Sequence, residues 1–347
     1  MAGLRLGSLH ALEQDKRNPF WRRFLGAPLP SADTIGRVFC LLEEAGLRRL
    51  LHGVYDRLKR NKALEGKVLL LDGHETTASY LRCCPGCSQR RMPDGRIQYY
   101  HRVVLAMLIG GRVPLLLDVE PQRRGEDEVA AALRLLGDYP RAFDLVVTDG
   151  LYLGAPFVRF CLGHGKDVVI VLKDDRRDLL QDAQGLFHLE PPRVEAEGSL
   201  VRKMWDVEGL TSWTALDAPL RVVRSLETRT ILRQRTKTVE TLTSDWIWAT
   251  TLPPEKASTR RVIDAGHNRW LVENKGFREM ATFWHSDHIY RHDAGAILAF
   301  LLTLMAALNL FRAFVLLNIK PCLRVRHSQL WFAAQITAGV FAEGPSP

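Results

Sequence analysis

The sequence predicts a mixed α/β fold in which helices cover a sheet that carries an inserted β-rich domain and follows a helical N-terminal region. Three observations lead to this class. Short apolar runs after residue 66 predict strands. Three consecutive strands precede a helix–strand–helix–strand order, which is typical of a mixed sheet. Finally, the segment 176–255 is rich in Thr, Val, Arg and Trp, as expected for β structure.

Residues 1–65 are expected to form the helical N-terminal region. Ile35, Val38, Phe39 and Leu42 recur at helical spacing after the capping residue Ser31. We expect Gly46 to end that helix. A second helix is predicted around Leu50 to Leu58.

Residues 66–175 are expected to form the first part of the core. Lys67 to Asp72 predicts a buried strand that ends at an acid, and Gly110-Gly111 predicts a turn between two further strands. The remaining predicted elements are, in order, strands at 98–109 and 113–119, a helix at 126–136, a strand at 143–149, a helix at 155–162 and a strand at 167–172.

Residues 176–255 form the predicted β-rich insertion, 256–320 a helical second part of the core, and 321–347 a C-terminal tail. Helices are expected at 258–281 and 293–317. The segment Ala294 to Leu308 is almost wholly apolar, but about fifteen residues fall short of the ~20 that a membrane-spanning helix needs. We therefore expect a buried helix and no membrane association.

The composition indicates a basic intracellular protein. Lys and Arg number 48 against 39 Asp and Glu, giving a net charge of +9, which favours polyanionic partners such as nucleic acid. Six cysteines in 347 residues do not make a disulfide framework, and basic residues interrupt any N-terminal leader. A reduced setting, in the cytosol or at the nucleoid, is the simpler expectation.

Asp72 and Asp149 share one context: each follows a buried apolar strand and precedes a glycine. Carboxylates at such strand ends face the crevice where ligands bind, and two of them held close together favour a bound cation such as Mg²⁺ or Mn²⁺. The alternative is that Asp-Gly merely ends a strand in a turn. Asp118 and Glu120 form a competing acidic pair.

A third acid, Glu273, lies in the helix predicted near residue 270. Arg269 precedes it by four residues, so the two side chains share a helix face. An ordinary surface ion pair, contributing less than about 1 kcal/mol, is an equally good interpretation of this spacing alone.

Together, Leu-Leu-Asp72-Gly, Val-Val-Thr-Asp149-Gly and Arg269-Trp-Leu-Val-Glu273-Asn resemble the DDE transposases of bacterial insertion sequences, in the branch with a β-strand insertion between the second and third acids. That branch has a signature helix: Tyr, two residues, Arg, three residues, Glu, six residues, Lys. Arg269 and Glu273 fit this spacing, whereas Gly266 and Met280 stand at the tyrosine and lysine positions.

The resemblance implies an RNase H-like core, with Asp72, Asp149 and Glu273 as a triad that binds two Mg²⁺ or Mn²⁺ ions, and with Arg269 on DNA phosphate. It further implies double-stranded DNA partners, namely inverted-repeat element ends and target DNA, a homodimer that synapses two ends, and a nucleoid-associated location. The expected function is cleavage of element ends and strand transfer. The alternatives are a nuclease that cuts without joining and a decayed or domesticated DNA-binding protein.

Several other groups are candidate DNA contacts. Arg229, Arg233, Arg235 and Lys237 share parity, so on one strand they would form a basic row; a solvated edge strand is the alternative. Lys275 and Arg278 add charge near Glu273, and residues 1–65 are a further candidate contact with DNA ends. The tryptophans of the insertion, Trp205, Trp213, Trp246 and Trp248, are expected to fill a β core rather than stack on bases.

A Cys-x-x-Cys motif lies between two predicted strands, in Cys83-Cys84-Pro85-Gly86-Cys87. Zinc needs four ligands, which Cys84 and Cys87 would complete with two of Cys83, His74 and His101. With no second motif of this type, a turn with free thiols is the leading interpretation and zinc at Cys84 and Cys87 the alternative.

Overall fold

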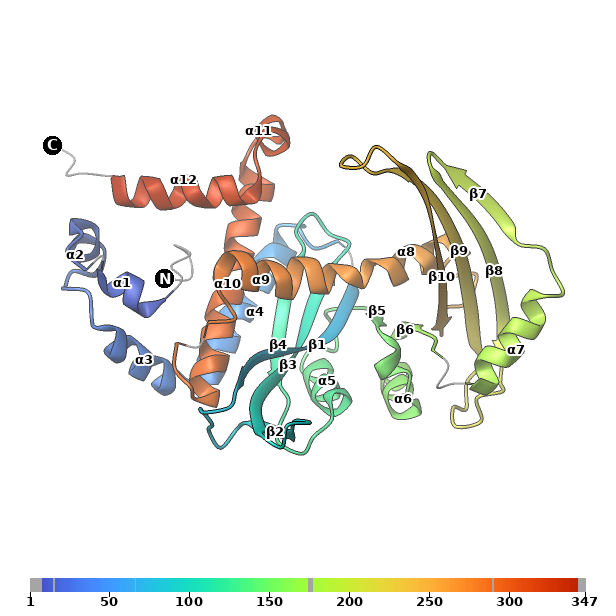
Figure 1. The fold of residues 1–347 in the computed structure, drawn as a ribbon, viewed down its shortest axis with the longest axis horizontal. Helices are drawn as coiled ribbons and strands as arrows, with labels where there is room; N and C mark the ends of the chain where they lie inside the picture. Colours follow the sequence, from blue (N-terminus) through green and yellow to red (C-terminus); the bar gives the residue numbers. More distant parts are fainter. Residues whose placement is uncertain (1–7, 15, 66, 174–176, 289, 343–347) are drawn as a thin grey trace. The chain divides into compact units, whose positions relative to one another are not determined.

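The computed structural model describes residues 8–14, 16–65, 67–173, 177–288 and 290–342 (Figure 1). The chain divides into two compact units. Unit 1 comprises Met1–Lys67, Leu71–Asp138 and Leu271–Pro347, and unit 2 comprises Val68–Leu70 and Tyr139–Trp270. Strands and helices together give the predicted mixed α/β class.

The N-terminal part of unit 1 is helical, as predicted. Its helices are α1 (Leu9–Gln14), α2 (Pro19–Leu25), α3 (Ala32–Leu41) and α4 (Glu44–Arg60). Ser31 caps α3 as expected, since its Oγ accepts a hydrogen bond from the Thr34 amide. The prediction that Gly46 ends a helix was wrong. The chain turns at Leu42, and Gly46 lies in the first turn of α4, where a glycine costs little.

The strands of unit 1 are β1 (Val68–Ser79, from Leu71 onward), β2 (Ser88–Arg91), β3 (Ile97–Ile109) and β4 (Leu115–Pro121). The expected turn between β3 and β4 is confirmed, and Gly110 adopts φ 93° there. The prediction that the first strand ends at Asp72 was wrong, because β1 continues to Ser79. Helix α5 (Glu128–Gly137) contacts both β3 and β4.

The C-terminal part of unit 1 begins with a π-helical turn, η4 (Val272–Arg278), followed by α9 (Glu279–Trp284), α10 (Ala294–Asn318), α11 (Pro321–Arg326) and α12 (Gln329–Ala342). Among the described residues, α10 is one helix that is long and apolar enough to cross a membrane. However, 61% of its most apolar window is buried inside the protein, as in the core helix predicted from the sequence.

Two polar residues of α10 anchor it inside unit 1. The buried Asn309 amide donates to the Leu116 carbonyl and accepts from the Leu116 amide, so it pairs with the β4 backbone. Arg312, 1% exposed, pairs with Glu279 at 3.0 Å and also donates to the carbonyl of Lys275. This guanidinium therefore satisfies backbone in η4, where the regular helical ladder is interrupted.

Unit 2 is built on one continuous set of paired strands: the first residues of β1, then β5 (Leu145–Thr148), β6 (Asp167–Val171), β10 (Val239–Thr250), β9 (Leu220–Leu232), β8 (Leu200–Leu210) and β7 (Arg193–Glu197). Val68–Leu70, β5 and β6 are parallel, and the pairs from β10 to β7 are antiparallel. The β-rich segment therefore extends the same sheet through the β6–β10 pair.

The helical elements of unit 2 are η2 (Gly150–Tyr152), α6 (Ala155–Gly163), α7 (Arg177–Phe187) and α8 (Thr259–Asn268). Figure 1 shows α7 beside the long curved strand β8, which it contacts. The region from 176 to 255 thus contains a helix besides the expected strands. The helix expected from 258 to 281 is interrupted by η4.

Candidate functional site

Asp149, in unit 2, directly follows β5. Its carboxylate accepts a hydrogen bond from the Leu151 amide at 2.9 Å and so caps η2. The Lys173 ammonium lies 3.6 Å from the same carboxylate. A Cβ at Gly150 would come within 2.7 Å of the Lys173 side chain, so this glycine makes room for the lysine. The acid is thus held by backbone and by one cation.

Asp72, in unit 1, lies within β1, and its Oδ1 accepts a hydrogen bond from the Gly73 amide. The next residue of the strand, Gly73, faces an acid that the sequence analysis missed, Glu128. A Cβ at Gly73 would lie 2.0 Å from the Glu128 carboxylate, and Arg102 pairs with that carboxylate at 3.1 Å. Glu128 is 7% exposed. The packing of this buried acid against the residue after a candidate catalytic aspartate is visible only in three dimensions.

Glu273, also in unit 1, is half-buried in η4. Such π-helical turns occur frequently at functional sites. Gly276 lets η4 approach β3 closely, because a Cβ there would lie 2.8 Å from Leu105. Phe277 stacks on His74, with ring centroids 4.4 Å apart. Within unit 1, the turn that carries Glu273 is therefore packed against the strand that carries Asp72.

Asp72 and Asp149 are separated by the same number of residues from two strand residues that pair with each other. In unit 2, Leu70 of β1 pairs in parallel with Val147 of β5. Asp72 and Asp149 each follow their paired residue by two positions. This equivalence depends on the parallel pairing, which the sequence alone did not establish.

The competing acidic pair has a structural role. Arg48 forms ion pairs with both Asp118 and Glu120, and Arg134 pairs with Glu120 at 2.7 Å. Asp118 is 1% exposed, and although burial opposes it, these acids raise the pKa of Arg48. Two arginines therefore already balance these two carboxylates, which link α4 and α5 to β4.

The structure explains the two departures from the signature helix. At the tyrosine position, a Cβ on Gly266 would lie 2.3 Å from the buried Trp248 indole, so the tryptophan fills the space of a side chain there. At the lysine position, Met280 is 3% exposed and belongs to the core. Lys275 and Arg278 are exposed, whereas Arg269 lies 5.4 Å from the Trp270 ring.

The prediction of a basic row on one strand was wrong. Arg229 lies on β9, but Arg233, Arg235 and Lys237 lie in the turn between β9 and β10, where Lys237 adopts φ 55°. Alternation along a strand therefore does not apply to them. All four are exposed, and Arg233 pairs with Glu240 at 2.7 Å. We call these four residues the basic hairpin tip.

The tryptophans of the insertion have mainly packing roles. Trp248 is 1% exposed and stacks with Trp246, at 6.1 Å between centroids. Trp205 receives the Arg224 guanidinium on its ring. These contacts favour the expectation that such tryptophans build the β core.

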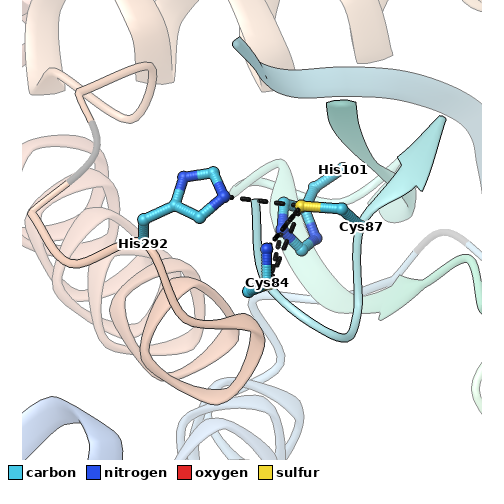
Figure 2. A group of neighbouring side chains, drawn as sticks. All are labelled: Cys84, Cys87, His101 and His292. Atoms are coloured by element: carbon cyan, nitrogen blue, oxygen red, sulfur yellow. Dashed lines mark hydrogen bonds between the residues drawn. The ribbon is translucent and has the colours of Figure 1, made fainter. Parts of the chain in front are cut away.

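Two cysteines and two histidines of unit 1 converge (Figure 2). Cys84 and Cys87 lie in the loop between β1 and β2, His101 is on β3, and His292 immediately precedes the capping residue of α10. Their ligand atoms all lie within 4.8 Å of one another. Burial lowers the pKa of His101 and of His292, which favours neutral imidazoles, and burial raises the pKa of the Cys87 thiol.

This cluster corrects the ligand set expected from the sequence. His292 is the member that the sequence analysis missed, because it lies 191 residues beyond His101. Cys83 is exposed, and the His74 ring stacks on Phe277 instead.

The comparisons with known proteins identify one family. A family model described as "Transposase DDE domain" matches residues 65–310, well over half of the chain. No curated protein matches the chain.

Proposed function

The chain belongs to the DDE transposase family, and on this premise we propose that it cuts the ends of a mobile DNA element and joins them to target DNA. The observation that carries the proposal is the family match over residues 65–310, which spans all three predicted acids. The mixed sheet agrees with the RNase H-like fold of such enzymes.

We assign Asp72, Asp149 and Glu273 as the catalytic carboxylates. Three observations support this choice. Asp72 and Asp149 lie two residues beyond Leu70 and Val147, which are partners in the parallel pairing of β1 and β5. Glu273 lies in a π-helical turn packed on the strand of Asp72. The competing acids Asp118 and Glu120 are instead paired with arginines.

The donor set of the proposed triad fits a hard divalent cation, because carboxylate oxygens are the ligands that Mg²⁺ and Mn²⁺ prefer. Two such ions, when bound, supply activation of the nucleophile and stabilisation of the leaving oxygen. Near Asp149, the ammonium of Lys173 balances part of the negative charge. We propose that this lysine holds the Asp149 carboxylate in place before cation and DNA are bound.

The basic side chains of the chain would bind and orient DNA. Lys275 and Arg278 are exposed on the turn that carries Glu273, so they suit phosphates beside the scissile bond. We assign Arg269, at the signature position, to the same backbone. The basic hairpin tip is a second proposed phosphate contact. A homodimer would hold the two element ends together, in the nucleoid of the cytoplasm.

The reaction needs only a change of nucleophile between its two stages. Water first attacks the phosphodiester at the element end and releases a 3′-hydroxyl. That hydroxyl then attacks a target phosphodiester, so one bond forms for each bond broken. The protein must hold both DNA segments in line with the same carboxylates.

The test is an assay with labelled DNA from the sequences on either side of the gene, searched for inverted repeats, plus a target plasmid and Mg²⁺. Asp72→Asn, Asp149→Asn and Glu273→Gln are each expected to abolish cleavage, by ~10³-fold or more, and to leave the DNA-binding constant nearly unchanged. Matched controls are Asp217→Asn and Glu43→Gln, at positions whose side chains are 93% and 76% exposed.

The products separate the alternatives. Joined product supports a transposase, cut product without joining indicates a nuclease, and a mobility shift without chemistry indicates a DNA-binding protein. If any of the three variants cuts at the wild-type rate, that residue does not belong to the triad.

A further inference from the structure

We propose that Cys84, Cys87, His101 and His292 bind one zinc ion in a closed, four-coordinate structural site. The site is separate from the proposed catalytic carboxylates, since none of its members is one of them. The inference does not depend on the proposed transposase activity.

Four distances between the ligand atoms are close to those of ligands around tetrahedral zinc, and all of these atoms lie within 4.8 Å of one another. Zn–S bonds of about 2.3 Å at the tetrahedral angle place two sulfurs about 3.8 Å apart, and Zn–N bonds of about 2.0–2.1 Å place sulfur and nitrogen about 3.6 Å apart. The Cys84 and Cys87 sulfurs are 3.7 Å apart. His101 Nε2 lies 3.3 and 3.2 Å from these sulfurs, and His292 Nε2 lies 3.4 Å from that of Cys87.

The chemistry of the donor set points to zinc rather than to magnesium. Two thiols and two imidazoles form one of the usual structural zinc sets, whereas hard cations prefer oxygen ligands. Figure 2 shows dashed lines from the sulfur of Cys87 to both imidazole rings, which come from a strand and from the segment before α10. With four protein ligands the coordination is complete, so the site has no open position for catalysis.

The backbone from Cys84 to Cys87 forms a tight turn that brings the two cysteines together. The Cys87 amide donates to the Cys84 carbonyl at 3.0 Å, which closes a tight turn, and the Cys84 amide donates to the Cys87 sulfur. Gly86 sits inside the turn, where a Cβ would lie 2.7 Å from Ala294 and 3.6 Å from His101. The glycine therefore allows the cysteine turn to pack directly on the start of α10.

The proposed ion joins three segments of unit 1 that are distant in sequence. It ties the β1–β2 loop and β3 to the residue before Asp293, whose side chain caps α10 by accepting from the Ala296 amide. The segment from α9 to α10 follows the turn that carries Glu273. Zinc binding would thus fix the chain on the C-terminal side of that turn.

The first experiment measures metal content after expression in zinc-supplemented medium and purification without an affinity metal. The wild-type protein is expected to hold about one zinc per chain. Cys84→Ser and His292→Asn are each expected to lose most of it. Cys83→Ser is the matched control, one residue away, exposed and outside the cluster, and it should retain the wild-type content.

A second measurement uses the wild-type protein alone, in case the variants fail to fold. Cys40, Cys83 and Cys322 are exposed, and Cys161 is buried. A thiol reagent should therefore modify those three exposed cysteines rapidly in the zinc-loaded protein. Removal of zinc by a chelator should make Cys84 and Cys87 reactive as well. Replacement by Co²⁺ should give the visible absorption of a tetrahedral site with thiolate ligands.

Three outcomes would overturn the inference. The first is wild-type protein without zinc that also binds no added Zn²⁺ or Co²⁺. The second is equal zinc loss in Cys83→Ser and Cys84→Ser. The third is a Cys84–Cys87 disulfide in protein kept under reducing conditions. None of these outcomes concerns DNA cleavage, so the zinc site and the proposed function are tested separately.

Discussion

The imidazole of His74 lies almost flat on the ring of Phe277, with centroids 4.4 Å and planes 22° apart. His74 follows Asp72 by two residues, and Phe277 follows Glu273 by four. Burial lowers the pKa of His74, which favours the neutral form of the stacked imidazole. This contact joins the strand of one proposed catalytic acid to the turn of another within unit 1.

Phe277→Ala is expected to lower the free energy of unfolding by about 3 kcal/mol, because it empties a site that is 7% exposed. Cleavage should fall further than DNA binding, since η4 would no longer be held against β1 by this ring. Phe314→Ala, at a position 44% exposed on α10, is the control and should cost less than about 1 kcal/mol. Thermal and denaturant unfolding measure the difference. Equal effects of the two changes would contradict a special role for the His74–Phe277 stack.

Gly73→Ala should be destabilising by about 1–3 kcal/mol, because its methyl group would overlap the Glu128 carboxylate. Gly53→Ala is the contrasting change. It lies within α4, where an added Cβ would meet open space, so it should stabilise the protein by about 0.5–1 kcal/mol. The Gly73→Ala and Glu128→Ala pair should be coupled in a double-mutant cycle, with the second change relieving the first. Strict additivity would show that the two residues do not interact.

We expect Glu227 to make the free energy of unfolding depend on pH in the acidic range. Burial by itself would raise its pKa, but hydrogen bonds from His267 and Ser225 and the charge of Arg202 lower the pKa of Glu227 to about 2. Its folded pKa is below its unfolded value of 4.5. The ionised Glu227 carboxylate therefore stabilises the folded protein fully above pH 4.5, and this stabilisation is lost as the pH falls toward 2.

After allowance for solvent screening, we expect this stabilisation to be about 2 kcal/mol. Glu227→Gln should flatten the pH dependence of unfolding between about pH 4.5 and 2. Glu208→Gln, an exposed change on β8, serves as the control and should leave the slope as in the wild type. An unchanged slope in Glu227→Gln would contradict the assignment.

The basic hairpin tip is expected to contribute to DNA affinity without reading sequence. Replacing Arg229, Arg235 and Lys237 together by Ala should weaken binding to any duplex and lower the salt slope of log K by about 0.9 for each phosphate that the protein no longer neutralises. Titrations at several salt concentrations measure this slope. Arg193→Ala, whose side chain is 72% exposed on β7, is the control. If the triple variant keeps the wild-type slope, the hairpin tip does not bind phosphates.

Local patterns in the sequence were sufficient for most elements. Apolar runs indicated β3, β4, β5 and β6, and the Ser31 cap indicated α3, because such signals depend on neighbouring residues. Local patterns gave wrong predictions where the structure depends on contacts between residues that are distant in the sequence. Parity predicted one strand for Arg233, Arg235 and Lys237, but the chain reverses there through a turn.

For the proposed catalytic carboxylates, too, the sequence supplied one part of the description and the structure another. Asp72, Asp149 and Glu273 were identified from short motifs and their order, and the family match spans all three. Only the structure showed that Arg48 and Arg134 pair with the competing acids, and that Trp248 takes the space beside Gly266. These contacts join residues far apart in the chain, so no local pattern encodes them.

Sequence patterns were enough to identify the class of the fold, the family and the two cysteines of the proposed zinc site. Packing in three dimensions was needed to bring His292 to Cys84, Cys87 and His101, and to set Glu128 against Gly73. The reason is physical. The spacing of apolar residues indicates which face of a helix or strand is buried. It does not indicate which other segment packs on that face, because that segment can be tens to hundreds of residues away in the sequence.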